Sequence, residues 1–79
     1  GYGIKFMGKR VYYVKSTRNM KHAQVMRCNY NGSKMKVLKK LKSSWNMSGF
    51  RFIGKHKVRY HISSDYNQPY KSAYKTAKF

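Results

Sequence analysis

The 79-residue sequence has almost no acidic residues: Asp65 stands alone against 19 Lys and Arg, and the formal net charge is +18. General acid–base catalysis by paired carboxylates needs two such groups, so we expect no enzyme of this kind. Like charge at this density repels itself, and a compact domain that carries it is expected to bind a polyanion. The candidate partners are nucleic acid, an anionic membrane and an acidic protein.

Cysteine is equally scarce. Cys28 is the only one, so no intramolecular disulfide can form, which favours a reducing interior or a chain held by its partner. A lone cysteine is more often a small buried hydrophobe than a nucleophile. His22, His56 and His61 are scattered and lack the ligand spacing of a zinc site, so we read them as solvated or RNA-facing imidazoles. We expect no metal, no cofactor and no small-molecule substrate.

Long apolar runs are also missing. No segment is long enough to span a bilayer, and the first residues contain no signal-peptide core. The hydrophobic content of 41% and the aromatic content of 16% are nevertheless too high for a disordered basic arm. The sequence therefore predicts one small domain, residues 1–68, of marginal stability, because a chain of this size buries only roughly 60% of its unfolded surface.

Alternating β-branched and aromatic residues predict several short hairpins. The stretch IKFMGKRVYYV indicates two strands joined at Gly8-Lys9, and Asn31-Gly32, a strong hairpin signal, separates two further extended stretches. In GFRFIGKHKVRYHI, apolar and basic residues alternate on both sides of Gly54, which predicts the clearest strand pair. We expect Phe52 in the core and attribute Tyr12, Tyr13 and Tyr60 to the faces of the sheet.

The stretch after Asn31-Gly32 is ambiguous. Met35 and Val37 alternate as in a strand, whereas Leu38 and Leu41 have helical spacing, so this segment is either a strand or a short helix, with strand favoured. The following SSWNMS is typical of a loop. Together these features predict an α+β fold: a small, mostly antiparallel sheet of short hairpins, at most one short helix, and a basic C-terminal tail.

The predicted tail comprises residues 69–79. Pro69 cannot donate to a sheet ladder, so we expect it to end the folded part and the tail to be ordered by its partner. Lysines contact phosphates with release of counterions, and aromatic rings stack on exposed bases, which makes RNA the favoured polyanion. The predicted RNA-binding residues, from the tail and the domain together, are Lys5, Lys9, Arg10, Lys21, His22, Lys39, Lys40, Lys55, Lys57, Tyr70, Lys71, Tyr74, Lys75 and Lys78.

Four pieces of the chain carry a family resemblance. They are GYGIKF, then NMKHAQVMRC with its histidine at His22, then FRFIGKHK with Gly54 and Lys57, and finally QPYKSAYK with its Pro-Tyr-Lys at residues 69–71. In this order, over about one domain's length, they resemble the second domain of large-subunit ribosomal protein six. His56 replaces an acidic residue of the family's pattern, and Ser72-Ala73-Tyr74 replaces Gly-Lys-Gly.

The resemblance implies a small α+β domain, without catalytic activity, that docks on large-subunit ribosomal RNA and on neighbouring ribosomal proteins near the elongation-factor binding region. The abundance of Lys, Asn, Tyr, Phe and Met fits an AT-rich coding genome. We therefore expect the ribosome of an organelle, located in the mitochondrial matrix or in another organelle.

The alternative is a secreted cationic antimicrobial or bacteriocin-like protein that acts on anionic membranes, which would share the small size, the basic charge and the aromatic content. Against it, no single segment has the apolar face of a membrane-surface helix. A small DNA-binding architectural protein is less favoured, because the sequence shows no clear recognition helix.

Overall fold

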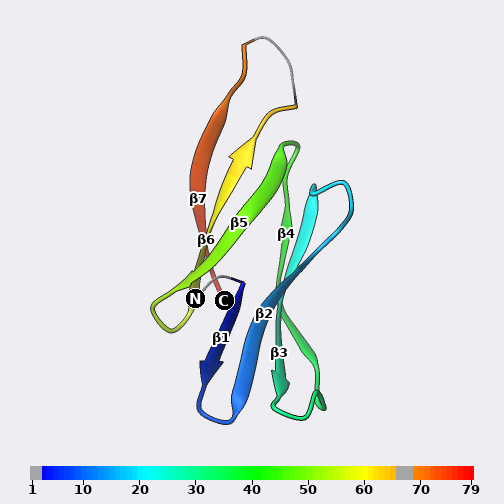
Figure 1. Ribbon diagram of the computed structural model, residues 1–79, viewed down its shortest axis with the longest axis vertical. Helices are drawn as coiled ribbons and strands as arrows, with labels where there is room; N and C mark the ends of the chain where they lie inside the picture. The colour runs from blue at the N-terminus through cyan, green and yellow to red at the C-terminus, as the bar shows by residue number, and fades with distance from the viewer. Residues whose placement is uncertain (1–2, 66–68) are drawn as a thin grey trace.

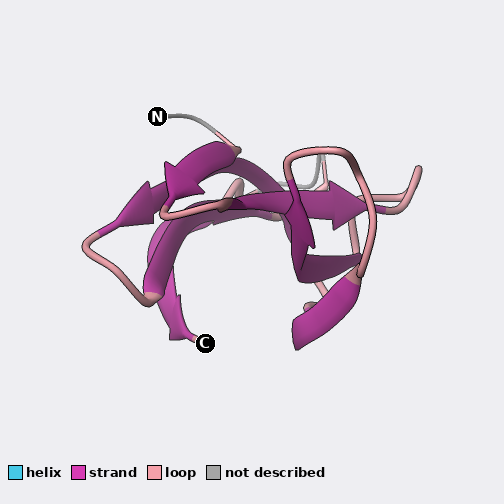
Figure 2. Ribbon diagram, turned by 90° about the horizontal axis from the view of Figure 1, so that it is seen from below, coloured by secondary structure: helices cyan, strands magenta, loops and turns pink. Residues whose placement is uncertain are grey.

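The computed structural model describes residues 3–65 and 69–79, and these residues form strands and loops without a helix (Figures 1 and 2). The mostly antiparallel sheet is confirmed, whereas the predicted α+β class with one short helix is not. The strands are β1 (Ile4–Met7), β2 (Arg10–Ser16), β3 (His22–Asn29), β4 (Lys36–Lys42), β5 (Asn46–Ile53), β6 (Lys57–Ser63) and β7 (Ser72–Lys78).

The strands form two antiparallel sheets, and within each sheet every strand but the last pairs with the strand that follows it in sequence. The first sheet has the order β1-β2-β3-β4 and the second the order β5-β6-β7. The predicted turn at Gly8-Lys9 is confirmed: Met7 pairs with Arg10, and Gly8 has a φ of 65°, which glycine adopts without steric cost. The predicted turn at Asn31-Gly32 joins β3 to β4, and Gly54 lies in the turn between β5 and β6.

One hydrophobic core is shared by both sheets. As expected, Tyr12 and Tyr60 are each 7% exposed and Phe52 is 8% exposed. The curvature of the sheets, seen in Figure 2, brings residues from both around this core. The buried members are Tyr12, Ala23, Val25 and Leu41 from the first sheet and Met47, Phe52, Val58, Tyr60 and Ile62 from the second.

A β-bulge explains the mixed spacing of the ambiguous segment, which is the strand β4 as favoured. Val25 pairs with Lys39 but the next residue, Met26, pairs with Val37, so Leu38 is an extra residue in β4. A bulge interrupts the alternation of side chains along a strand. Leu38 and Leu41 therefore both pack towards the core although they are three residues apart.

The stretch SSWNMS is only partly a loop, because β5 already begins at Asn46. Asn46 pairs with Ser63 and Met47 with Ile62, and Met47 is 1% exposed. Serine and asparagine, which are typical of loops, flank this core methionine and conceal the strand in the sequence.

The prediction of a tail outside any strand is wrong. Ser72–Lys78 form β7, which pairs with β6 from Ser63↔Ser72 to Lys57↔Lys78. The strand was missed because it lies at the edge of the sheet and has only Ala73, Lys75 and Ala77 on the face that its partner β6 turns to the core, so its apolar pattern is weak. Pro69 precedes the strand and, without a backbone N–H, cannot donate a hydrogen bond to the ladder.

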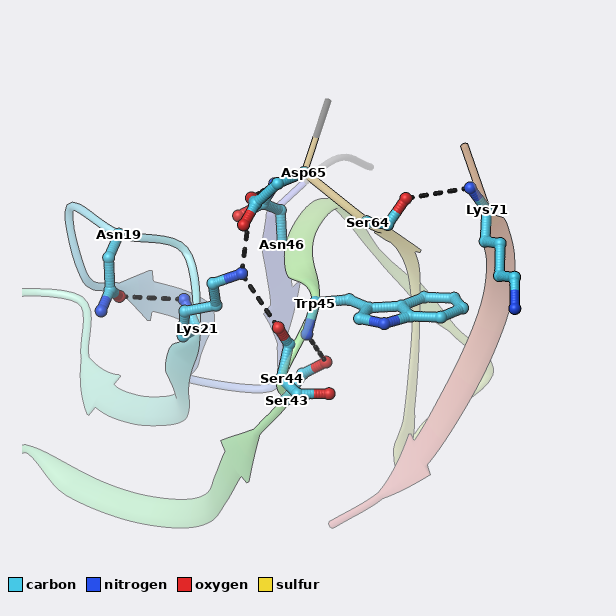
Figure 3. Close-up of polar contacts among 9 residues, drawn as sticks. All are labelled: Asn19, Lys21, Ser43, Ser44, Trp45, Asn46, Ser64, Asp65 and Lys71. Carbon is cyan, nitrogen blue, oxygen red and sulfur yellow. Dashed lines mark hydrogen bonds and ion pairs between the residues drawn. The ribbon is translucent and has the colours of Figure 1, made fainter. Parts of the chain in front are cut away.

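The single acidic residue joins the ends of several strands (Figure 3). Lys21 Nζ lies 3.6 Å from Asp65 Oδ1 and donates to the carbonyl oxygen of Ser44 at 2.9 Å. Asn46 Nδ2 donates to the same carboxylate oxygen at 3.0 Å. These contacts connect the loop before β3 to the start of β5 and the end of β6. At the opposite end of β5, Lys5 Nζ donates to the carbonyl oxygen of Gly54.

Candidate functional site

The outer face of the first sheet, which points away from the core, carries a continuous group of apolar side chains. Residues that pair directly across antiparallel strands project to the same face of the sheet. The registers therefore place Ile4, Tyr13, Met26 and Val37 in one row across all four strands. A second row contains Phe6, Val11 and Cys28. Beside these rows lies Met35, whose Sδ accepts a hydrogen bond of 3.2 Å from the Tyr13 hydroxyl. We call these eight residues the apolar face.

Much of the apolar face is open to solvent. Phe6 is 67% exposed, Met35 65%, Ile4 53% and Val37 40%. Met26, in contrast, is only 7% exposed although it lies outside the core cluster, because it sits in the middle of the apolar face. A contiguous exposed patch of this kind marks an interaction site more often than scattered surface residues do.

Tyr30 extends the apolar face at its turn end. Its ring stands edge-on to Phe6 with centroids 5.8 Å apart, and it is 59% exposed. The hydroxyl donates to the carbonyl oxygen of Gly8 at 2.6 Å, which ties the β3–β4 loop to the β1–β2 turn. The two turns that carry these residues lie at the same end of the first sheet (Figure 1). The two turns at this end of the sheet are therefore joined to each other by an aromatic side chain.

The other half of the same outer face is cationic. The register continues from the apolar rows to the row of Lys15, Gln24 and Lys40, and then to His22 and Lys42. The three lysines and the histidine are exposed. We call these residues the cationic rows. The outer face of the first sheet is thus amphipathic along its strands, apolar near the turns and positive towards the other end.

The outer face of the second sheet is different in character, because it is cationic over much of its length. Arg51 pairs with Arg59 across β5 and β6, and Lys57 pairs with Lys78 across β6 and β7. Like charges directly opposite one another destabilise a sheet unless a counterion neutralises them. This face therefore favours contact with anions.

The predicted RNA-binding residues are distributed over the whole molecule. His22 and Lys40 fall in the cationic rows, and Lys57 and Lys78 lie on the outer face of the second sheet together with Tyr74. The structure uses Lys5 and Lys21 in internal contacts instead. The remaining residues are exposed on turns, loops and strands: Lys9, Arg10, Lys39, Lys55, Tyr70, Lys71 and Lys75.

The sequence analysis did not predict the apolar face, because no single segment contains enough of its residues to form a recognisable pattern. Each strand or its flank contributes two residues to it, and the pairs come together only through the register. One signal was available in Val11 to Val14, where four consecutive apolar residues must occupy both faces of a strand. In a small domain only one face of such a strand can pack on the core, so the apolar residues on its other face indicate a surface that binds a partner.

In residues 3–65 and 69–79, no three His, Cys, Asp or Glu side chains lie close enough together to hold a metal ion. Cys28 is free and half-buried within the apolar face. The part of the chain that the structure describes also has no helix long and apolar enough to cross a membrane.

Comparisons of the chain with protein-family models, with curated proteins and with solved structures find no match. The function must therefore be inferred from the surface of the chain itself.

Proposed function

We propose that this protein is a cationic protein that docks on anionic lipid membranes through the outer face of its first sheet, as an antimicrobial or bacteriocin-like protein would. The observation that carries the proposal is the position of the apolar face beside the cationic rows on one side of one sheet. No enzymatic activity is part of this proposal.

A membrane surface combines the two chemistries that this face presents. Apolar side chains gain free energy when they enter the boundary between headgroups and acyl chains, and each basic residue near an anionic surface contributes about 1 kcal/mol. Phe6, Ile4 and Met35 would enter the interface, while Lys15 and Lys40 would remain at the level of the headgroups. The net charge of +18 would strengthen attraction to such a surface.

Other occupants of the apolar face fit less well. A second copy would bring another charge of +18 against the first, which opposes self-association through this face. RNA would satisfy the lysines but would leave Ile4, Met35 and Val37 without an apolar partner, because bases stack on aromatic and arginine planes.

The test is a flotation assay with vesicles of phosphatidylcholine, with or without phosphatidylglycerol. We expect binding to the anionic vesicles and little to the neutral ones. The Phe6→Ser and Met35→Ser double variant should bind about tenfold more weakly. Tyr70→Ser is the matched control, because Tyr70 is 53% exposed and lies outside the apolar face. Trp45 fluorescence would verify that each variant is folded.

Equal binding by the Phe6→Ser and Met35→Ser variant would exclude docking through the apolar face. Binding without release of an entrapped dye would support docking and argue against a membrane-disrupting action. Partition into a complex with an added acidic protein in preference to vesicles would assign the face to a protein partner and overturn the proposal.

A second candidate is a structural ribosomal protein that binds large-subunit RNA and neighbouring ribosomal proteins in an organelle. The paired cations Arg51↔Arg59 and Lys57↔Lys78 favour it, since a phosphate backbone would neutralise them. Sedimentation of native extract at moderate and then high salt tests it. Co-migration with large ribosomal subunits would support this candidate, whereas recovery as a free protein would favour the membrane proposal.

A further inference from the structure

A hollow on the outer face of the second sheet brings together two arginines and the rings of Phe50, His61 and Tyr74. It lies beside the bulge at Gly49 and is lined by Ser48, Arg51, Arg59, His61 and Tyr74, among others. The bulge arises because Ser48 pairs with His61 but Arg51 pairs with Arg59, so β5 has one residue more than β6 over this interval. Bulges bend a strand locally and change the direction of its side chains.

Among the described residues, no acidic side chain pairs with either arginine. The sequence contains one carboxylate side chain, that of Asp65, and it is engaged by Lys21 and Asn46. Arg51 and Arg59 are nevertheless direct cross-strand partners, an arrangement that costs free energy without a counterion. An anion bound between them would remove this repulsion.

The aromatic rings hold one of the arginines in position. The guanidinium carbon of Arg59 lies 4.5 Å from the centroid of the Tyr74 ring, within the range of a cation–π contact. His61 packs on the same ring with centroids 5.1 Å apart. Tyr74 itself is 66% exposed, so the stack is open to a ligand from solvent. A guanidinium held in this way loses less conformational entropy when it binds a ligand.

We propose that this hollow is a phosphate-binding site in which Arg51 and Arg59 clamp one phosphate group. The planar fork of arginine matches the oxygens of phosphate and forms paired, charge-assisted hydrogen bonds with it. The ligand is a phosphate group on an accessible molecule, either a lipid headgroup or a soluble phosphate. The site belongs to the second sheet, so this inference does not rest on membrane docking by the apolar face.

The first experiment is an NMR titration of the full chain with inorganic phosphate at constant ionic strength, without lipid. We expect saturable shifts of the Arg51, Arg59, His61 and Tyr74 signals. Arg59→Lys keeps the charge but loses the fork, and it should weaken binding about tenfold. Arg51→Lys should do the same.

The matched control for charge is the Lys34→Gln and Lys36→Gln double variant, which removes two positive charges outside the second sheet and outside the cationic rows and should leave the affinity within about twofold. Shifts that spread over all lysines without saturation would overturn the proposal. So would unchanged phosphate affinity in both arginine variants, because either result would indicate a diffuse ion atmosphere.

The source of the phosphate is decided by vesicles that carry phosphatidic acid or phosphatidylserine at equal surface charge. Stronger binding to phosphatidic acid that is lost in Arg59→Lys would identify a lipid headgroup. Equal binding to both vesicles, with the phosphate titration still saturable, would identify a soluble phosphate. If the wild-type protein binds neither kind of vesicle but still shows saturable phosphate binding, the proposed membrane function is contradicted and the phosphate site is supported.

Discussion

The rings of Phe52 and Phe79 meet edge to face, with centroids 5.7 Å apart and planes inclined at 86°. Phe79 also lies 5.9 Å from the ring of Tyr12, and its backbone N–H donates to the carbonyl oxygen of His56 at 2.9 Å. One aromatic side chain after β7 thus contacts a strand of each sheet. The C-terminal stretch is part of the folded domain through this contact as well as through the β6–β7 ladder.

We expect Phe79→Ala to destabilise the protein by about 2 kcal/mol, below the usual cost of truncating a fully buried phenylalanine because this ring is only partly buried. The measurement is the midpoint of urea unfolding followed by Trp45 fluorescence. Tyr70→Ala serves as the control and should leave the midpoint unchanged. An unaltered midpoint for Phe79→Ala would mean that the ring does not contribute to the core.

Phe52→Ala should have a larger effect, about 3 to 5 kcal/mol, because the ring lies in the shared core and is 8% exposed. A small domain has little stability in excess of this amount. We therefore expect the variant to lose its cooperative thermal transition in circular dichroism. A variant that unfolds at the wild-type temperature would contradict the position of Phe52 in the core.

Gly49→Ala tests the bulge in β5. Gly49 has a φ of 61°, a left-handed conformation that costs other residues about 1–2 kcal/mol, and a Cβ at this position would meet no atom within 4 Å. We expect a loss of stability of this size from backbone strain alone, measured by urea unfolding. Gly3→Ala is the control, since it also has open space but no such φ. Equal stability of the two variants would contradict the bulge geometry.

Asp65→Asn should lower stability by about 1 kcal/mol or less, because the ion pair with Lys21 lies at the surface. The loss should shrink as salt is added, since salt screens both the lost attraction and the remaining repulsion among the cations. Urea unfolding at low and high ionic strength measures this. A loss that is independent of salt would assign the role of Asp65 to its hydrogen bond with Asn46.

Lys71→Ala and Lys75→Ala together test the RNA candidate. If β7 follows a phosphate backbone, the affinity for RNA should fall by a similar factor for different sequences, and the slope of log affinity against log salt should decrease by about 2. Filter binding over a range of salt concentrations gives this slope. An unchanged slope would remove β7 from any RNA contact.

The sequence predicted the features that depend on neighbouring residues. The turn at Gly8-Lys9 and the strand pair around Gly54 follow from local backbone preferences and from alternation with a period of two. Local signals were ambiguous at Leu38, where a bulge imitates helical spacing although strand was favoured, and they failed in β7, where an edge strand carries almost no apolar pattern.

The sequence by itself determined that the protein is strongly cationic and without an internal disulfide, because charge and cysteine number follow from composition alone. It also indicated short strands, because alternation of apolar and polar residues is a local pattern. Only the tertiary structure decided which residues share a surface. Strand register places Phe6, Val11 and Cys28 in one row across three strands, although no local pattern links Phe6 to Cys28. Surfaces built in this way depend on pairing between distant segments, which the free energy of the whole fold selects.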